Sequence, residues 1–310
     1  MVGSHLIEHY FAKGIKPVAT YFSPTIDITE VADKCAYRYC DVTDAAMTDV
    51  LIRESMPDII YHLAAQSLPV LSWQLPNETM HTNSAGTVNV FESVKKLKAS
   101  HPGYDPMIVV ACSSAEYGAT LALYDGPVTE DAALLPLHPY GVSKVAQDLL
   151  AFQYFSTFGI RCIRARIFNT TGVRKQNDVV SDFTKRAVQI ELGQATDFNC
   201  GNLHTRRAIT DVRDLIVALE LLAEKGMPGD VYNISGAHIY EMQDIVTTIE
   251  AVMDCRLNPR QDPALMRPQD EPIIYGDSSK LHAATGWQQT IPLRQTIEDM
   301  IAYWRWKLQK

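Results

Sequence analysis

Short apolar runs that alternate with amphipathic segments constrain the fold of this chain more than any other feature. Two helical patterns, at residues 78–97 and 143–158, lie between the runs. Four runs are expected strands: residues 15–22, 58–63, 107–113 and 160–168. Strands that are apolar throughout are typical of parallel sheets with helices on both faces. The pattern therefore predicts an α/β fold with a doubly wound parallel sheet.

The start of the chain departs from this pattern. A doubly wound dinucleotide-binding domain opens with a strand and a glycine-rich turn, and the ligand's phosphates lie at the N-terminus of the next helix. Here Met1 to His5 lead directly into a helical pattern at residues 6–13. We therefore expect the first strand and two of three glycines to be missing. Gly3 is the remaining glycine and is expected beside the cofactor.

The last third of the chain changes character. It contains a loop region at 174–179, a helical pattern at 181–192 and a proline-rich stretch at 258–272. We expect residues 1–166 and 205–235 to form the dinucleotide-binding domain. Residues 167–204 and 236–310 are expected to form a smaller lobe over the carboxyl edge of the sheet, where such sheets bind ligands.

Composition narrows the classes of function. A net charge of −8 gives no basic footprint for nucleic acid. There is no apolar stretch of membrane-spanning length and no signal-peptide pattern. The six cysteines form no C-x-x-C pair, and the histidines show no metal-binding spacing. These features predict a cytoplasmic protein with reduced cysteines and no metal site.

Tyr140 and Lys144 form the sharpest chemical pattern. Residues four apart on a helix share one face, so the ammonium group lies near the phenol and favours its ionised form. Such a tyrosine is a general acid or base for a hydroxyl or carbonyl group. Taken alone, a Y-x-x-x-K pair is more often an ordinary surface pair.

Two hydroxyls, Ser113 and Ser114, end the expected strand at 107–113, about twenty-five residues before Tyr140. A hydroxyl at a strand end is placed to hydrogen-bond a reacting oxygen. Taken alone, the pair is an ordinary strand-terminating turn, and its pairing with Tyr140 is the more specific signal.

Two further strand ends offer places for a cofactor. Asp41 and Val42 follow one apolar stretch, and small residues that admit a close ligand follow another, at Leu63, Ala64, Ala65 and Gln66. The strand at 15–22 ends in Tyr21, Phe22 and Ser23, with no carboxylate to repel a 2′-phosphate. NADP is therefore favoured over NAD.

Together these motifs resemble the extended short-chain dehydrogenase/reductase family, from Met1 to about Trp287. They read D-V at Asp41, H-L-A-A at His62, N-x-x-G-T-x-N-V from Asn83, S-S-x-x-Y-G from Ser113 and P-Y-G-V-S-K ending at Lys144. The resemblance implies a Rossmann-type domain with bound NAD or NADP, a nucleotide-sugar substrate and a homodimer. It implies the catalytic trio Ser113, Tyr140 and Lys144, with Asn83 near the cofactor.

Later segments resemble the GDP-sugar members of that family. These are R-x-F-N ending at Asn169, the segment from Val180 to Lys185, G-N-L followed by Arg207, and R-P ending before Glu271. The resemblance places Asn169, Val180, Lys185, Arg207, Arg267 and Glu271 at the substrate, with Ser114 and Glu116 beside it. Guanidinium groups suit a diphosphate because they bind it bidentately.

One position distinguishes two reactions. GDP-mannose 4,6-dehydratases carry a glutamate two residues after the catalytic Ser or Thr, and here that position is Ala115. Glu116 is displaced by one, which in an extended segment turns its side chain away. The sequence thus favours reduction of GDP-4-keto-6-deoxy-mannose. The alternatives are a dehydratase, then a 4-epimerase, then a non-catalytic homologue.

Overall fold

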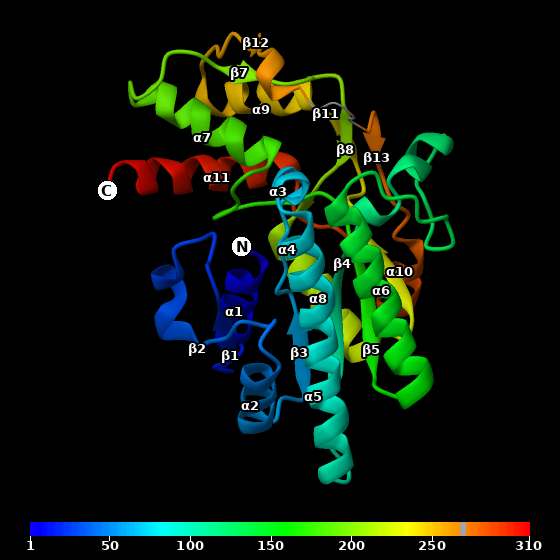
Figure 1. Ribbon diagram of the computed structural model, residues 1–310. Coiled ribbons are helices and arrows are strands. Elements are labelled where there is room, and N and C mark those ends of the chain that lie inside the picture. Colours follow the sequence, from blue (N-terminus) through cyan, green and yellow to red (C-terminus); the bar gives the residue numbers. More distant parts are fainter. Residues whose placement is uncertain (267–270) are drawn as a thin grey trace.

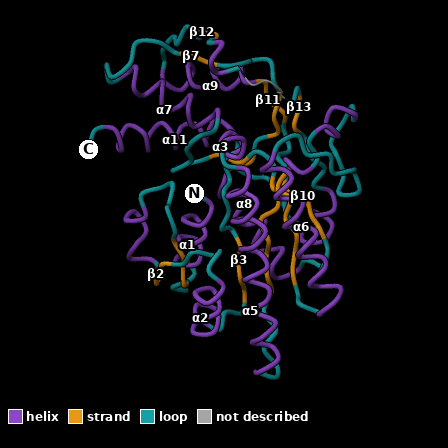
Figure 2. Tube along the Cα trace, in the orientation of Figure 1, coloured by secondary structure: helices purple, strands orange, loops and turns teal. Residues whose placement is uncertain are grey.

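The computed structural model describes residues 1–266 and 271–310, and it has two parts (Figure 1). An α/β layer holds parallel strands between helices. A smaller helical lobe lies across the carboxyl ends of those strands (Figure 2). Arg267, expected at the substrate, lies outside the described residues.

Four parallel strands form the main sheet, in the order β10-β5-β4-β3. They are β3 (Ile59–His62), β4 (Met107–Ser113), β5 (Cys162–Ile167) and β10 (Val231–Ile234). Residues 108–110 of β4 are fully buried, as expected for a strand covered by helices on both faces. The α/β prediction is confirmed, and three predicted strands match β3, β4 and β5.

Two further strands form a separate sheet. β1 (Val18–Tyr21) and β2 (Ala36–Tyr39) run parallel to each other, and neither pairs with the main sheet within the described residues. The predicted strand at 15–22 is β1. The sheet expected to be continuous is therefore divided between β1 and β3.

Helices cover both faces of the main sheet. On one face lie α1 (Val2–Ala12), α8 (Val212–Lys225) and α10 (Ser279–Thr285), with a core that includes Leu215 and Leu219. On the other lie α2 (Ala45–Ser55), α5 (Gly86–Ser100) and α6 (Pro139–Phe158), with a core that includes Phe91 and Val94. Burying each such side chain contributes roughly 1.5–3 kcal/mol.

The helix predicted at 78–97 is three consecutive segments, which follow the short helix α3 (Pro69–Gln74). They are α4 (Pro76–Met80), a π-helical turn at His81–Ala85 and α5. The wider π turn contains Asn83, whose side chain reaches both the loop after β3 and α6. Inserted π turns often occur at functional sites.

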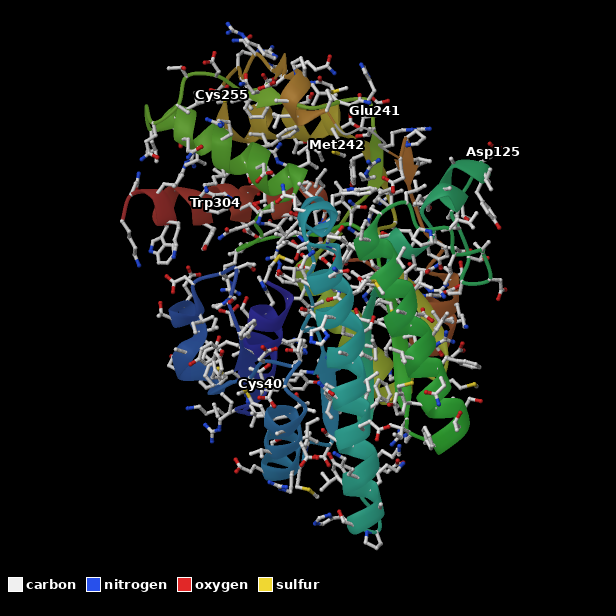
Figure 3. All side chains as sticks on the ribbon, in the orientation of Figure 1. Cys40, Asp125, Glu241, Met242, Cys255 and Trp304 are labelled. Atoms are coloured by element: carbon white, nitrogen blue, oxygen red, sulfur yellow. The ribbon has the colours of Figure 1, made fainter. Side chains whose placement is uncertain are left out.

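The smaller lobe is built on α7 (Val179–Glu191), α9 (Met242–Met253) and α11 (Leu293–Leu308), which share one apolar core. Met242 and Cys255 lie in the upper part of this lobe, and Trp304 lies on α11 (Figure 3). Short strands complete the lobe and its junction with the sheet. They are β6 (Thr170–Thr171), β7 (Asn199–Cys200), β8 (Arg206–Ala208), β9 (Thr210–Asp211), β11 (Ile239–Glu241), β12 (Arg260–Gln261) and β13 (Ile273–Ile274).

The structure also bears on the cysteines and on the length of apolar helices. All six cysteines are free thiols, and Cys255 alone is partly exposed. Among the described residues, no helix combines the length and apolar character needed to cross a bilayer.

Candidate active site

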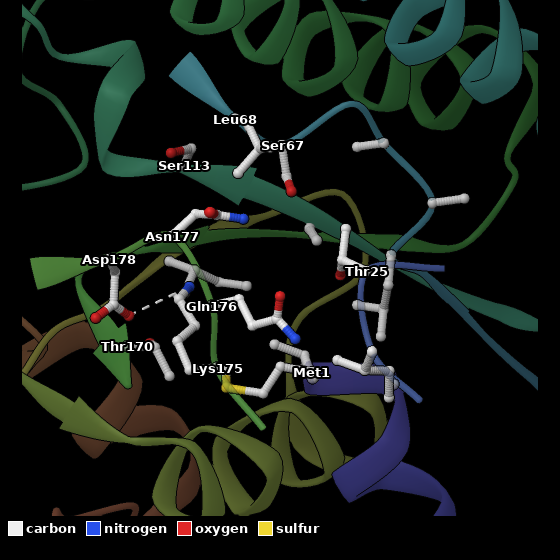
Figure 4. Close-up of a pocket in the computed structure, with 18 of the residues that line it drawn as sticks. Met1, Thr25, Ser67, Leu68, Ser113, Thr170, Lys175, Gln176, Asn177 and Asp178 are labelled. Atoms are coloured by element: carbon white, nitrogen blue, oxygen red, sulfur yellow. Dashed lines mark ion pairs between the residues drawn. The ribbon is translucent and has the colours of Figure 1, made fainter. Parts of the chain in front are cut away.

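A cavity of about 2660 Å³ lies between the carboxyl ends of the strands and the smaller lobe. Met1 of the segment leading into α1, Ser113 of β4 and Lys175 of the loop before α7 line it from three directions (Figure 4). Sheets of this class bind their ligands at this edge. Most of the predicted site residues lie on its walls.

Tyr140 and Lys144 lie in the first turns of α6. The helix is capped by His138, whose Nδ1 accepts a hydrogen bond from the backbone N–H of Gly141 at 3.0 Å. The Nζ atom of Lys144 is 5.7 Å from the centre of the Tyr140 ring and donates to the carbonyl oxygen of Ala111 at 2.8 Å. The structure thus brings the predicted pair together and anchors its lysine to β4.

Burial sets the ionisation of this pair. It raises the pKa of Tyr140 to about 12, although a hydrogen bond with Ser113 opposes the rise, so the expectation that Lys144 favours the ionised phenol is not met. It lowers the pKa of Lys144 to about 8, against the opposing charges of Cys112 and Glu116. The phenol therefore keeps its proton near neutral pH and is ready to donate it.

Gly141 allows α6 to approach β4 closely. A Cβ atom at this position would lie 2.6 Å from the carbonyl oxygen of Ala115 and 2.9 Å from Cβ of Pro136. Only glycine tolerates this approach without displacement of the backbone. The close contact places Tyr140 beside the turn that carries Ser113.

Ser113 lies at the end of β4 and caps the short 3-10 turn Ser114–Glu116. Its Oγ accepts from the backbone N–H of Ala115 at 3.2 Å, and its own N–H donates to Oε1 of Glu116 at 2.7 Å. Oγ thus accepts from an amide, and the Ser113 hydroxyl also makes the hydrogen bond with Tyr140 that opposes the rise in the pKa of the phenol.

Glu116 is fully buried and does not line the cavity, unlike Ser114 and Ala115. Its Oε2 lies 3.2 Å from Nε of Arg166, which also pairs with Oδ2 of Asp148 at 2.9 Å. Burial and the charge of Asp148 raise the pKa of Glu116, while Arg166 opposes the rise. The capping bond to Ser113 turns the carboxylate into the core, which departs from the expectation that it meets the substrate.

Asp148, Glu116 and Cys112 are close enough in space to be considered as metal ligands. Their ligand atoms lie within 4.8 Å of one another. The guanidinium of Arg166 pairs with both carboxylates, and Arg164 donates to Asp148 at 2.6 Å. The two arginines therefore occupy the places beside these carboxylates where a metal ion would lie. Through Glu116, the cluster supports the turn that holds Ser113.

The expected cofactor residues divide into two groups. Six of these residues line the cavity: Gly3, Asp41, Val42, Leu63, Ala64 and Ala65. Gln66 and Asn83 instead hold the wall from behind. The Asn83 side chain accepts from the Gln66 N–H at 2.8 Å and donates to Oγ of Ser143 at 2.8 Å, which ties the loop after β3 to α6.

The expected substrate residues come from the segment after β5, from α7, from β8 and from the segment before β13. Asn169, Val180, Lys185, Arg207 and Glu271 all line the cavity. One guanidinium nitrogen of Arg207 donates to the backbone oxygens of Arg206 and Glu271 at 2.9 and 2.8 Å. These bonds hold Arg207 on β8 while it faces the cavity.

Sequence reasoning missed three cations that also line the cavity, Arg174, Lys175 and Arg186, of which Arg174 is paired with Glu8 of α1. The first two lie in a segment that was identified only as a loop, so no periodicity marked them. The available signal was their density, because basic residues recur from 174 to 186 in a chain of net negative charge. Together they favour an anionic ligand in this part of the cavity.

Comparison with known proteins agrees with this arrangement. The family model described as GDP-mannose 4,6 dehydratase matches residues 1–300. A GDP-6-deoxy-D-mannose reductase of Pseudomonas aeruginosa is 28% identical over 82% of this chain and 83% of its own length. A GDP-mannose 4,6-dehydratase of Yersinia enterocolitica is 24% identical over 97% of this chain and 90% of its own.

Solved structures show the same fold. RMD from Pseudomonas aeruginosa, complexed with NADPH, superposes with a TM-score of 0.83 at 27% identity, covering 99% of this chain and 96% of that one. UDP-glucose 4-epimerase from Thermotoga maritima, with UDP-glucose, reaches 0.90 at 19% identity over 99% and 96%. The chain therefore belongs to the GDP-mannose 4,6-dehydratase family of extended short-chain dehydrogenase/reductase enzymes.

Proposed function

We propose that this enzyme reduces the 4-keto group of GDP-4-keto-6-deoxy-mannose with NADPH. The observation that carries the proposal is the turn Ser113–Glu116. It presents a hydroxyl and the methyl group of Ala115 to the cavity, while its single carboxylate is buried against Arg166. The site thus offers an acid beside a hydroxyl donor and no second acid or base on this turn.

The residues along the strand ends fit a nicotinamide dinucleotide. Leu63, Ala64 and Ala65 leave room for close approach to the backbone, and Asp41 offers a carboxylate beside them. Lys144 is positioned to hold ribose hydroxyls. When bound, NADPH supplies the hydride for carbonyl reduction, and RMD from Pseudomonas aeruginosa is described in complex with it.

The preference for NADPH over NADH rests on the end of β1. Tyr21, Phe22 and Ser23 line the cavity there and carry no carboxylate. A carboxylate at this position binds the ribose hydroxyls in NAD sites and repels a 2′-phosphate. NAD remains the alternative cofactor, and it is the one described for the UDP-glucose 4-epimerase of Brucella ovis.

The chain's own groups account for the proton transfer. Tyr140 is protonated near neutral pH and donates its proton to the oxygen that forms at C4. Ser113, which shares a hydrogen bond with Tyr140, orients that oxygen through its hydroxyl group. The ammonium group of Lys144 stabilises the phenolate that remains.

The nucleotide end of the substrate is assigned to the part of the cavity lined by α7 and β8. Lys185 and Arg207 were expected there, and Arg186 of α7 adds positive charge. Guanidinium and ammonium groups bind diphosphate by charge-assisted hydrogen bonds. Asn169, which follows β5 and also lines the cavity, is assigned to the phosphates.

A dehydratase is the second candidate, since several relatives carry that name. Dehydration removes the proton at C5 and releases water at C6, which requires a second acid or base near the sugar. Glu116 would have to leave its pairs with Arg166 and its bond to the Ser113 N–H to serve. These contacts oppose that movement and weigh against this reaction.

The homodimer expected from the resemblance remains part of this proposal. α6 exposes Val142, Leu149 and Phe152 on its outer side. Sedimentation of the purified protein tests it directly: a dimer supports the proposal, and a monomer at micromolar concentration contradicts it.

Two incubations test the reaction. The first contains GDP-4-keto-6-deoxy-mannose and NADPH, and the second contains GDP-mannose and NADP alone. We expect NADPH oxidation and a GDP-6-deoxyhexose in the first, and unchanged GDP-mannose in the second. Loss of water from GDP-mannose would overturn the assignment and would place Glu116 at C5. Fluorescence titration with NADPH, run in parallel, separates a wrong sugar from a failure to bind cofactor.

A further inference from the structure

His138 is the last residue before α6, and it lines the cavity two positions ahead of Tyr140. Its carbonyl oxygen accepts the first hydrogen bond of the helix, from the N–H of Val142 at 3.1 Å. The N–H of Gly141 comes too early in the helix to have a partner inside it, and Nδ1 of His138 accepts from it at 3.0 Å. One residue therefore fixes both amides that follow Tyr140.

The His138 ring also contacts Tyr140 directly. The two rings are nearly parallel, with centroids 5.9 Å apart and an angle of 16° between their planes. Aromatic rings at this separation attract each other. The cap therefore fixes the backbone on which Tyr140 lies, and the ring contact restrains its side chain.

The segment that carries His138 is itself tied to the chain that follows Ser113. The carbonyl oxygen of Leu135 accepts from the N–H of Ala119 at 2.9 Å, and the N–H of Leu135 donates to the carbonyl oxygen of Tyr117 at 3.3 Å. His138 follows this paired stretch closely. Its position relative to the Ser113 turn is thus held by backbone hydrogen bonds, and the cap passes that position on to the start of α6.

The cap requires an uncharged ring. Nδ1 can accept from Gly141 only when it carries no hydrogen, which leaves the hydrogen of the neutral imidazole on Nε2. Serine, threonine, asparagine and aspartate are the commoner caps, and aspartate would bring a negative charge to this position. Tyr140 becomes a phenolate once it has donated its proton, and a nearby negative charge opposes that ionisation. A neutral acceptor caps the helix without opposing the proton transfer.

We propose that His138 is a positioning residue for Tyr140, which it holds at the cavity through an uncharged N-cap and a parallel ring contact. The inference rests on the proposed role of Tyr140 as the proton donor. His138 exchanges no proton with the substrate and acts by fixing the direction of the phenol toward the reacting oxygen. A small displacement of a catalytic group lowers the rate by up to about 100-fold.

Three substitutions separate the cap from its charge. His138→Ala removes the acceptor, and kcat is expected to fall roughly 10- to 100-fold with an unchanged KM for NADPH. His138→Asn restores an uncharged cap, and kcat should recover to within about fivefold of the wild type. His138→Asp caps the helix equally well but should remain roughly tenfold slower than His138→Asn, because its charge opposes the phenolate.

Asp44→Ala is the matched control. Asp44 caps α2 in the same way, since it accepts from the N–H groups of Ala46 and Met47 at 2.9 and 3.0 Å, and it is not among the residues that line the cavity. Chemical denaturation and steady-state kinetics are measured for both alanine variants. We expect similar losses of unfolding free energy, with kcat unchanged in Asp44→Ala, which separates positioning from stability.

Amide exchange at Gly141, followed by NMR, reports the cap without any use of activity. Exchange should be roughly tenfold faster in His138→Ala than in His138→Asn. An unchanged kcat in His138→Ala, or equal losses in the alanine and asparagine variants, would overturn the proposal. A loss confined to KM for the sugar nucleotide would make His138 a substrate contact and would also overturn it.

Failure of the proposed function gives a different result. Absence of reduction by the wild type would contradict the role of Tyr140 in this reaction. Faster Gly141 exchange in His138→Ala would then still support the cap, and unchanged exchange would overturn it.

Discussion

At the scale of single residues, Tyr140 and Ser113 carry the proposed chemistry. Tyr140→Phe removes the proton donor, and activity is expected to fall roughly 100- to 10,000-fold. Ser113→Ala removes one hydrogen bond to the developing oxyanion, for which a loss of about 100-fold is expected. Steady-state kinetics measure both, with Tyr124→Phe, an exposed tyrosine, as the control. Full activity in Tyr140→Phe would remove this residue from the mechanism.

Glu116 gives a prediction in pH dependence. Burial and Asp148 raise its pKa, so the folded protein holds a proton that the unfolded chain has released above its ordinary pKa of 4.5. The folded state then binds more protons, and stability contributed by this group falls as pH rises above that value until the raised pKa is passed. Glu116→Gln cannot titrate and should lack this fall.

Chemical denaturation of the wild type and of Glu116→Gln at several pH values between 5 and 9 measures this difference. The gap in unfolding free energy should shift in favour of the variant with rising pH. A gap that is constant with pH would show that Glu116 has an ordinary carboxyl pKa, and with it an exposed position that the structure does not have.

Residue types predicted the site better than they predicted individual contacts. The spacing of Tyr140 and Lys144, and of Ser113 before them, identified groups that the structure brings together. Asn83 and Gln66 were expected at the cofactor but brace the wall, because the π turn that redirects Asn83 leaves no signal in the sequence. Glu116 was expected beside the substrate, and its buried position depends on Arg166, fifty residues later.

At the scale of elements, the packing of α6 against the turn after β4 is the critical contact. Gly141→Ala places a methyl group 2.6 Å from the Ala115 carbonyl oxygen, and the helix start must shift. We expect a loss of about 1–3 kcal/mol in unfolding free energy, with a larger loss of activity than this instability explains, because Tyr140 moves with the helix. Gly126→Ala is the matched control, since its added Cβ meets nothing within 4 Å. Equal behaviour of the two variants in denaturation and kinetics would contradict this account.

The strands β3, β4 and β5 were predictable within two or three residues, since short, mainly apolar runs mark them. The short strands of the smaller lobe were not. β7 and β12, for example, contain two residues each and pair across sixty positions, so local sequence carries no period for them. Their pairing is decided by the folded lobe.

At the scale of the whole molecule, Arg174 joins the α/β layer to the loop before α7. Its guanidinium donates to Oγ of Ser4 at 3.0 Å and pairs with Glu8 of α1. Arg174→Ala should lower the unfolding free energy by about 1–3 kcal/mol and raise KM for the sugar nucleotide, since the guanidinium is buried. Arg256→Ala removes the pair with Glu250, in which the arginine is exposed. It should change the unfolding free energy by no more than about 0.5 kcal/mol and leave KM unchanged.

The same pair has a defined pH response. Burial alone would raise the pKa of Glu8, but hydrogen bonds from Arg174 and Lys34 outweigh it and hold the pKa below its ordinary value. Its stabilising contribution is therefore present above pH 4.5 and is lost as pH falls through the lowered pKa. Denaturation of Arg174→Ala and wild type at pH 7 and pH 3 should show a smaller difference at the lower pH. A difference that grows on acidification would contradict the assignment.

The sequence predicted parallel strands between helices, and the structure divides those strands between two sheets, β1-β2 and β10-β5-β4-β3. The extent of the cavity was beyond sequence reasoning, since its walls come from segments nearly three hundred residues apart.

Transfer of isotope tests the central claim most directly. GDP-4-keto-6-deoxy-mannose is incubated with NADPH that carries deuterium at the transferable position on C4 of the nicotinamide ring. The product is examined by mass spectrometry and NMR. The account predicts one deuterium, at C4 of the sugar, in a GDP-6-deoxyhexose. It also predicts that Tyr140→Phe forms this product at least 100 times more slowly. Recovery of unlabelled substrate with cofactor bound, or deuterium at any other carbon, would contradict the claim that this site reduces a 4-keto sugar.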